Sequence, residues 1–420
     1  MKSPPESPVL NPRPASVVVE TLGAKTSETK EGLPQINQYI LKKEIGRGAF
    51  GTVHLGVDKN TGTEYAIKEF SKQRLRRREQ SAMLRRPGGL RGRGRGFGPQ
   101  VPRHAQSSGN PLDLVRTELA ILKKLNHPHV VRLFEVLDDP DNDSLYMVFE
   151  MAHKGVLMDV EAGGTVTPYS EEMARHFFRD MILGIEYLHY SNIVHRDIKP
   201  DNLLLSQDGV LKFVDFGVSE MFQKDNDLLK KSAGSPAFMA PELCTANHGE
   251  VSGKAADIWS MGVTLYCLIY GRLPFISTNF IELNSKICKD SVEYDKDTNP
   301  ELVMLLQRLL EKDPEKRITI SELRVDPWVT KHGEEPLISE EENNAAMVTE
   351  VTEEEINRAI SKIVPVFMVM KAVSKFKRHS RSMSQQSLSK VMDKPSSQES
   401  SDNDDIEQLK TETEDLHISS

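Results

Sequence analysis

The chain has 420 residues and a formal net charge of −8 at pH 7. This charge gives no reason to expect the whole molecule to bind DNA. Three cysteines without paired spacing predict neither a zinc site nor a disulfide framework. The first ten residues contain no apolar run typical of a signal peptide, and no apolar stretch is long enough to span a bilayer. We therefore expect a soluble intracellular protein, in the cytoplasm or also in the nucleus.

Residues 1–38 are rich in Pro, Ser, Thr and charge, and we expect them to be disordered. Strand-like patterns begin at Tyr39, and from Ser170 the apolar spacing becomes mostly helical until about Trp328. This order of strands first and helices afterwards predicts an α+β fold with two lobes. The segments predicted within the first lobe are strands at 39–55, 64–70, 130–137 and 145–149, and a helix at 112–125.

A glycine-rich segment runs from Gly46 to Gly51 between two predicted strands. Glycine lets the backbone come close to a phosphate group. The pattern alone is also compatible with a Rossmann turn or a chance hairpin, but no helix follows it, which disfavours the Rossmann reading. Lys68 lies on the next predicted strand, where it can reach nucleotide phosphates, and Glu118 in the helix at 112–125 is its expected partner.

The most specific motif is the run from His195 to Asn202, followed by Asp215-Phe-Gly. Phosphoryl transfer needs a carboxylate to orient the attacking hydroxyl and cations to neutralise the phosphate oxygens. Asp197 supplies the carboxylate and Lys199 a positive charge. Asn202 and Asp215 offer the hard oxygen atoms that Mg²⁺ prefers. Each acid alone is usually a surface charge, but the ordered set predicts a phosphotransferase.

Together these motifs resemble those of the eukaryotic protein kinases over residues 39–330. The resemblance implies the two-lobed kinase fold, with a small β-rich lobe and a large helical lobe, and it implies ATP and Mg²⁺ as cofactors. It also implies that Phe149 is the gatekeeper and that Glu150 and Ala152 form the hinge. The residues implied at the ATP site are Ile45, Gly46, Arg47, Gly48, Ala49, Phe50, Gly51, Thr52, Val53, Ala66, Lys68, Glu118, Phe149, Glu150, Ala152 and Leu204.

The same resemblance implies two structural contacts and a substrate class. Glu242, in Ala-Pro-Glu, would form a buried ion pair with Arg317, and Asp257 would brace the catalytic loop. Lys199 and Ser235 are similar to the residues at these positions in serine/threonine kinases rather than tyrosine kinases. The segment containing Pro236 favours peptide substrates over lipids or small molecules.

An Arg/Gly/Pro-rich insert at 74–111 lengthens the stretch between Lys68 and Glu118. An insert at this place, together with Leu157-Met-Asp, resembles the calcium/calmodulin-dependent protein kinase kinases. That subfamily uses the insert to recognise substrate protein kinases, which makes such kinases expected partners. RG repeats also bind RNA, and an inert basic loop is a third possibility.

The C-terminal region divides into an acidic linker at 331–351, a segment at 352–383 and a Ser-rich acidic tail at 384–420 that we expect to be disordered. The middle segment contains two amphipathic helical patterns separated by Pro365, and the second pattern is basic. A basic amphipathic helix is typical of a calmodulin target or a membrane-surface helix; a helix packed permanently on the large lobe is the structural alternative. The expected calmodulin-binding residues are Phe367, Met370, Lys371, Phe376, Lys377 and Arg378.

The activation loop has Lys231 where many kinases carry a phosphorylated Thr. Autoinhibition by 352–383, relieved by calcium-loaded calmodulin, is therefore the expected switch. The sequence thus predicts a calmodulin-activated serine/threonine kinase that phosphorylates the activation loops of other kinases. The alternatives are a serine/threonine kinase with another regulator, or a scaffold that binds RNA or protein partners through its insert.

Overall fold

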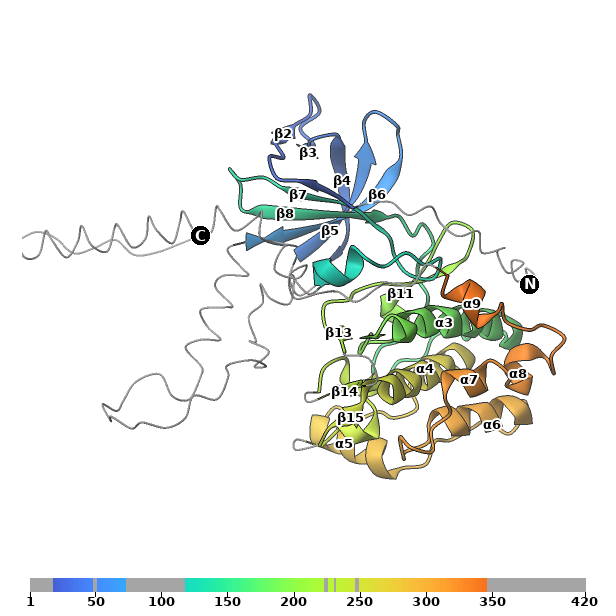
Figure 1. The fold of residues 1–420 in the computed structure, drawn as a ribbon. Helices are drawn as coiled ribbons and strands as arrows, with labels where there is room; N and C mark the ends of the chain where they lie inside the picture. Colours follow the sequence, from blue (N-terminus) through green and yellow to red (C-terminus); the bar gives the residue numbers. More distant parts are fainter. Residues whose placement is uncertain are drawn as a thin grey trace, which may run out of the picture. The chain divides into compact units, whose positions relative to one another are not determined.

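A computed structural model describes residues 18–47, 51–72, 118–222, 226–229, 232–245 and 249–345. Within the compact unit at residues 1–364, these residues form a β-rich lobe and a helical lobe (Figure 1). An eight-stranded sheet has the order β1-β7-β8-β6-β5-β4-β3-β2. Its strands are β1 (Val19–Thr21), β2 (Thr26–Glu28), β3 (Pro34–Ile36), β4 (Tyr39–Arg47), β5 (Gly51–Asp58), β6 (Glu64–Ser71), β7 (Leu133–Asp138) and β8 (Ser144–Glu150). The predicted α+β fold with two lobes is confirmed.

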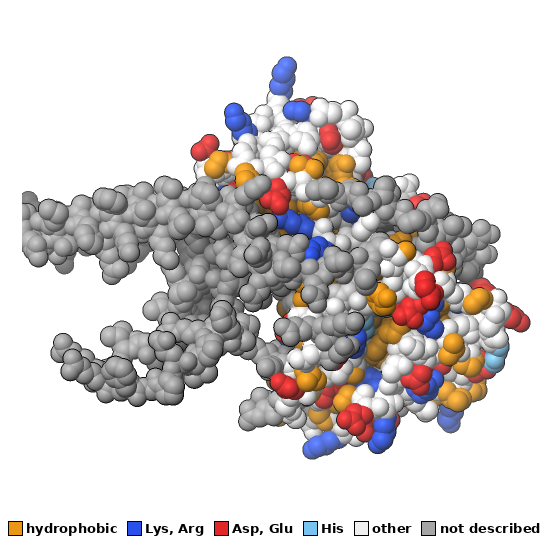
Figure 2. Space-filling model, viewed as in Figure 1, with side chains coloured by type: hydrophobic (Ala, Val, Ile, Leu, Met, Phe, Trp, Pro, Cys, Tyr) orange, Lys and Arg blue, Asp and Glu red, His pale blue; other side chains and the backbone are white. Residues whose placement is uncertain are grey.

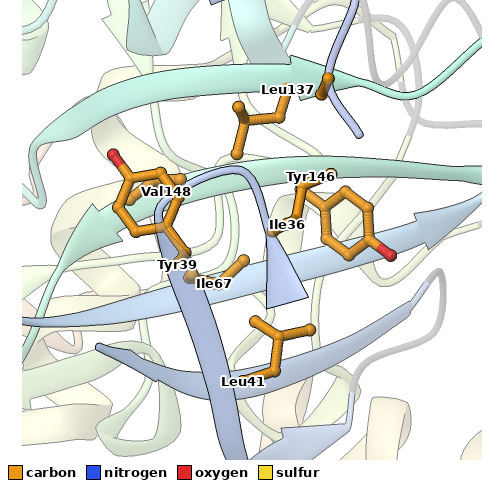
Figure 3. Packing of buried hydrophobic residues seen from close by; sticks show 8 residues of the cluster. Ile36, Tyr39, Leu41, Ile67, Leu137, Tyr146 and Val148 are labelled. Carbon is orange, nitrogen blue, oxygen red and sulfur yellow. The ribbon is translucent and has the colours of Figure 1, made fainter. Parts of the chain in front are cut away.

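The core of the small lobe is built from buried side chains on strands β3, β4, β6, β7 and β8. Strand β8 is buried at every position from Leu145 to Phe149, as expected of a strand covered on both faces. Ile36 on β3 and Ile67 on β6 are both 0% exposed. Figure 3 shows seven labelled members of the buried cluster, which come from five strands: Ile36, Tyr39, Leu41, Ile67, Leu137, Tyr146 and Val148.

The prediction that residues 1–38 are disordered is wrong for the described part, 18–38. Strand β1 pairs in parallel with β7, and β2 and β3 form a hairpin that continues into β4. Polar contacts fix these short strands: the Thr21 hydroxyl donates to Glu135 at 2.5 Å, and the Thr26 hydroxyl donates to Asp139 at 2.7 Å. All three residues of β2 are exposed, so no alternating apolar pattern marked the strand in the sequence.

The large lobe is built around two long helices. Helix α3 (Glu171–Tyr190) is capped by Ser170, whose hydroxyl accepts from the Met173 amide at 3.3 Å. Helix α4 (Gly253–Tyr270) is buried on most of its circumference and is capped by Gly271, in the left-handed conformation (φ 64°) that suits glycine. The other helices are α5 (Phe280–Lys289), α6 (Pro300–Leu309), α7 (Ile320–Leu323), α8 (Pro327–Thr330) and α9 (Glu340–Asn343).

Short strands and 3-10 turns lie within the loops between the lobes and around the activation segment. The strands pair as β11 with β9 and β12, β10 with β13, and β14 with β15. Their bounds, with those of the turns η1 to η3, are β9 (Gly155–Val156), β10 (Ile193–Val194), β11 (Leu203–Leu205), β12 (Leu211–Phe213), β13 (Glu220–Met221), β14 (Leu228–Leu229), β15 (Val251–Ser252), η1 (Pro200–Asn202), η2 (Pro236–Phe238) and η3 (Pro241–Leu243).

One strand begins later than predicted. Strand β7 starts at Leu133 rather than at Val130. Residues 129–131 pair instead with Phe213 of β12: the Val131 amide donates to the Phe213 carbonyl at 3.0 Å, and the Phe213 amide donates to the His129 carbonyl at 2.8 Å. This tertiary pairing takes the apolar residues at 130 and 131 out of the small-lobe sheet.

The domain also extends beyond the predicted boundary at 330. Arg179 on α3 donates to the carbonyls of Val329, Glu335 and Pro336 at 2.6–3.1 Å. Farther along the chain, Asn343 on α9 is 3% exposed. The described part of the predicted linker 331–351 is therefore attached to the large lobe, at Glu335 and Pro336 through Arg179 and at Asn343 through its own side chain.

Asn343 connects three segments through a single amide group. Its Nδ2 donates to the Leu183 carbonyl at 3.0 Å and to Glu186 Oε2 at 2.8 Å. Its Oδ1 lies 3.0 Å from His127 Nε2, while His127 Nδ1 accepts from the His129 amide at 3.1 Å. This arrangement requires a neutral His127 with its proton on Nε2. The segment after α8 is thereby linked to the loop that follows the helical residues 118–122.

Replacing Asn343 with Ala should destabilise the protein, because His127, Leu183 and Glu186 would each lose a buried hydrogen bond. We expect a loss of about 1–3 kcal/mol in the free energy of unfolding, measured by urea titration. The exposed Glu341 of the same helix is the control, and Glu341→Ala should change stability by less than about 0.5 kcal/mol. Equal effects of the two substitutions would show that α9 is not held by Asn343.

The surface of the described residues has mixed charge. On the face shown in Figure 2, Lys and Arg side chains lie among Asp and Glu side chains. None of the helices within the described ranges is both long enough and apolar enough to cross a bilayer.

Candidate active site

The catalytic loop is held by a buried carboxylate on helix α4. The amides of His195 and Arg196 donate to the two oxygens of Asp257 at 2.9 and 2.8 Å, and His189 Nε2 lies 2.9 Å from the same group. Asp257 is 0% exposed. Arg196 has a left-handed backbone (φ 69°), which is unfavourable for a residue with a Cβ. The contacts with Asp257, which the kinase resemblance implied, stabilise this conformation and fix the position of the next residue, Asp197.

Both oxygens of Asp197 accept hydrogen bonds. Oδ2 accepts from Asn202 Nδ2 at 2.8 Å, and Oδ1 accepts from the Ser235 amide at 2.8 Å. Lys199 Nζ lies 3.6 Å from Oδ2 and donates to the Ser235 hydroxyl at 2.7 Å. The carboxylate is therefore oriented by an amide, a backbone N–H and a cation, as required of a group that accepts a hydrogen bond from an attacking hydroxyl.

The contact between Ser235 and Asp197 depends on Gly234. Its backbone is left-handed (φ 102°), and a Cβ at this position would lie 2.3 Å from the Arg196 carbonyl oxygen. Only glycine allows this approach. From the sequence, Ser235 indicated only the substrate class, and its amide was not predicted as a donor to Asp197. The signal in the sequence was the glycine immediately before Ser-Pro.

Lys68 on β6 forms an ion pair with Glu118 and approaches Asp215. Its Nζ lies 2.9 Å from Glu118 Oε1 and 3.8 Å from Asp215 Oδ1. Burial by itself lowers the pKa of Lys68, but the Glu118 and Asp215 carboxylates outweigh it, so the pKa is raised overall. The ammonium group is therefore charged at neutral pH and placed between groups of the small and large lobes, where it can bind phosphate oxygens.

Asp215 is exposed for 53% of its side chain and has a left-handed backbone (φ 61°). The next residue, Phe216, is 1% exposed and packs against His195 with ring centroids 5.1 Å apart. Burial of Phe216 thus turns the neighbouring carboxylate out of the core. Asp215 Oδ1 also lies 3.4 Å from the Gly217 amide.

Asn202 and Asp215 provide the oxygen donors for a divalent metal. Asn202 uses Nδ2 to donate to the carbonyl and the carboxylate of Asp197, both at 2.8 Å, so its amide oxygen is directed away from Asp197. The described residues contain no group of three or more His, Cys, Asp and Glu side chains arranged to hold a metal by themselves. Two oxygen donors from the protein fit Mg²⁺, which completes its coordination with phosphate oxygens and water.

The small-lobe residues predicted at the ATP site lie on adjoining strands. Val53 on β5 is opposite Lys68 on β6, and Ala66 is opposite Phe149 on β8. A Cβ on Gly51 would lie 1.8 Å from the Glu69 carbonyl oxygen, so this position requires glycine. Gly46 and Arg47 are opposite Val53 and Thr52. Residues 48–50 lie outside the described residues.

The remaining residues predicted at the ATP site come from the hinge, the large lobe and the start of the glycine-rich segment. Leu204 on β11 is half-buried, and Ile45 is 39% exposed. The Glu150 amide donates to the Arg132 carbonyl at 3.0 Å, and the Ala152 carbonyl accepts from Gly155 at 3.1 Å. Both hinge residues therefore also contribute to the local backbone structure.

Two ion pairs hold the activation segment. Arg317, whose side chain is 0% exposed, forms a bidentate pair with Glu242 at 2.7 and 2.9 Å, as the resemblance implied. Arg196 forms an ion pair with Glu220. The Glu220 carboxylate thus neutralises the arginine next to Asp197.

The six predicted calmodulin-binding residues lie outside the described residues: Phe367, Met370, Lys371, Phe376, Lys377 and Arg378.

The fold and this constellation define a phosphotransferase of the protein kinase class. Consistent with this, the family model "Protein kinase domain" matches residues 100–329, which is more than half of the chain. The glycine-rich segment and Lys68 precede the matched range. The chain belongs to the protein kinase family, whose reaction uses ATP and a divalent metal.

Several protein kinases are similar over most of the chain. The calcium/calmodulin-dependent protein kinase kinase cmkC of Emericella nidulans is 49% identical over 383 residues, which cover 87% of this chain and 73% of that protein. A calcium/calmodulin-dependent protein kinase kinase of Caenorhabditis elegans is 43% identical over 84% of this chain and 64% of its own length. The serine/threonine-protein kinase GRIK2 of Arabidopsis thaliana is 37% identical over 74% and 70%, respectively. This chain is a protein serine/threonine kinase.

Proposed function

We propose that calcium-loaded calmodulin activates this kinase and that its substrates are the activation loops of other protein kinases. The observation that carries the proposal is the 49% and 43% identity to two proteins named calcium/calmodulin-dependent protein kinase kinases. We also propose that ATP binds between Val53 and Ala66 on one side and Leu204 on the other, with Mg²⁺ held by Asn202 and Asp215. Lys68 would then bind the α- and β-phosphates, and Asp197 would orient the substrate hydroxyl.

The ion pair between Arg196 and Glu220 supports a switch other than loop phosphorylation. In many kinases a phosphorylated activation-loop residue neutralises the arginine next to the catalytic aspartate. Here Glu220 Oε2 lies 2.5 Å from Arg196 Nη1, and a permanent carboxylate makes that phosphate unnecessary for charge balance. Control by a separate inhibitory segment then becomes the simpler way to regulate activity.

The attachment of α9 supports an inhibitory role for residues 352–383. Asn343 fixes the chain against helix α3 and His127, so the proposed inhibitory segment begins only a few residues beyond a fixed point on the catalytic domain. A short connection keeps the local concentration of such a segment high. Calmodulin can shift the equilibrium only by binding the released segment more tightly than the docked one.

The test compares three lengths of the protein with a catalytically inactive kinase as substrate. A variant ending at Val351 keeps Asn343 and should be active with calcium chelated, at a rate close to that of calmodulin-activated full-length protein. The full-length protein and a variant ending at Met383 should both require calcium and calmodulin. Phosphate should appear on the activation loop of the substrate kinase, identified by peptide mass spectrometry.

A substitution within the segment separates calmodulin binding from inhibition. Phe367→Asp should weaken calmodulin binding by about 2 kcal/mol or more, as for a desolvated anchor residue. Ile406→Asp places the same charge in the acidic tail and should leave calmodulin binding unchanged. If the variant ending at Val351 is no more active than full-length protein without calmodulin, the segment is not inhibitory. Unchanged affinity in Phe367→Asp would place the anchor elsewhere or remove calmodulin from the mechanism.

A further inference from the structure

Two of the three cysteines lie together at the end of the activation segment. Cys244 follows turn η3, and its thiol donates to the Ala240 carbonyl at 3.4 Å. Cys288 is on helix α5, and its thiol lies 3.6 Å from the Pro241 carbonyl. The two sulfur atoms thus contact consecutive carbonyl groups of the same turn. The Cys288 side chain is close enough to help raise the pKa of the Cys244 thiol.

Further contacts hold the two segments in this arrangement. Asn284, one helical turn before Cys288 on α5, donates to the Cys244 carbonyl at 3.0 Å. Lys312 donates to the carbonyl of Ile287, the residue before Cys288, and so brings an ammonium group near the thiols. A nearby cation stabilises a thiolate relative to a thiol. Both cysteines are partly accessible to solvent, whereas Cys267 on α4 is buried.

We propose that Cys244 and Cys288 form a reversible disulfide that inhibits the kinase when the protein meets a hydroperoxide. The Cys288 thiolate attacks the peroxide: an S–O bond forms, the O–O bond breaks, and the departing oxygen leaves as water or an alcohol. Cys244 then attacks the sulfur of this sulfenic acid, an S–S bond forms, and the hydroxyl leaves as water with the Cys244 proton. Two thiols lose two electrons and one peroxide is reduced.

The order of these steps follows from the environment of Cys244. Burial and the neighbouring Cys288 raise the pKa of the Cys244 thiol to about 12. At neutral pH it is protonated, and the thiolate is the reactive form. Cys244 therefore acts second, on a sulfur already beside it. Transient disulfides of this kind are typical of redox sensing in reducing compartments.

The disulfide would change the shape of the cavity next to Asp197. Ala240 and Leu243 line a cavity together with Asp197 and Ser235. Forming an S–S bond of about 2.05 Å removes both thiol protons and with them the contacts to the Ala240 and Pro241 carbonyls, and it links turn η3 covalently to α5. We expect the turn to shift in response. Movement of Ala240 and Leu243 changes the place where a peptide next to the reacting hydroxyl would lie. A shift of this kind is expected to lower kcat/KM about tenfold or more.

The test uses full-length protein treated with hydrogen peroxide, then alkylated and digested without reductant. We expect a peptide linking Cys244 to Cys288, protection of two thiols from alkylation, and at least a tenfold loss of kcat/KM, all reversed by dithiothreitol. Cys288→Ser should keep normal activity before and after peroxide. Cys267→Ala is the matched control and should behave like the unchanged protein. Separate sulfinic acids at the two positions, or full activity of the linked enzyme, would overturn the proposal.

Discussion

Replacing Asp197 with Asn should reduce kcat by about 10²–10⁴-fold, the range typical of a residue that handles the transferred proton. The structure gives a second reason for a large effect. The two carboxylate oxygens accept from different donors, Asn202 Nδ2 and the Ser235 amide. An amide has only one oxygen, so in either orientation its NH₂ group faces one of these donors. The variant therefore loses both the charge and one of the contacts that orient the loop.

The effect should lie in the chemical step. Asp257 still holds the loop, and Lys68 still pairs with Glu118, so KM for ATP should change by no more than about twofold. Asp201→Asn is a matched control, because it makes the same substitution four residues away at an exposed side chain. Steady-state rates on a peptide substrate measure both effects. An Asp197→Asn enzyme within tenfold of the unchanged kcat would show that Asp197 does not have the proposed role.

The two-lobed fold and the catalytic motifs could be predicted from the sequence. Each motif consists of residues close together in the chain. The run from His195 to Asn202 and the Asp215 motif are read from adjacent residues, and their chemistry follows from residue types. The ion pair between Lys68 and Glu118 required a partner across a long insert, but a lysine on a strand and a glutamate on a helix are a restrictive combination. Their separation of 2.9 Å in the structure agrees with that reasoning.

The parts that sequence analysis missed depend on contacts between distant residues. The Thr21–Glu135 hydrogen bond joins residues 114 positions apart, and the Asn343–His127 contact joins residues 216 positions apart. Strands β1 to β3 and helix α9 are three or four residues long, too short for their apolar periodicity to be recognised. Polar side chains specify them, and a polar residue in the sequence does not reveal whether its partner is water or protein.

Replacing Arg317 with Met should lower the free energy of unfolding by about 3–5 kcal/mol, because removal of one partner leaves a buried charge uncompensated. Arg317 is 0% exposed in its side chain, and Glu242 is 9% exposed. The guanidinium also donates to the carbonyls of Glu311 and Ala255 at 2.9 and 2.7 Å. Methionine can fill much of the volume but satisfies none of these acceptors.

Arg272→Met is the control, because Arg272 pairs with Asp295 at the surface, where the side chains are 37% and 61% exposed. An exposed pair contributes at most about 1 kcal/mol. Urea titration followed by tryptophan fluorescence measures both variants, and Arg317 lies 5.2 Å from the ring of Trp259. Equal losses in the two variants would mean that burial of the Arg317 pair adds nothing to stability.

Adding Glu242→Gln to Arg317→Met should recover at least about 1 kcal/mol, since the double variant no longer buries an unpaired carboxylate. Activity need not recover with stability. Glu242 belongs to turn η3, and Leu243 of that turn lines the cavity next to Asp197. Without the ion pair, η3 loses its attachment to the segment around Arg317, so the double variant should remain below the unchanged enzyme in kcat/KM. If stability and kcat/KM recover together, the pair only stabilises the lobe; if stability alone recovers, the pair also positions the activation segment.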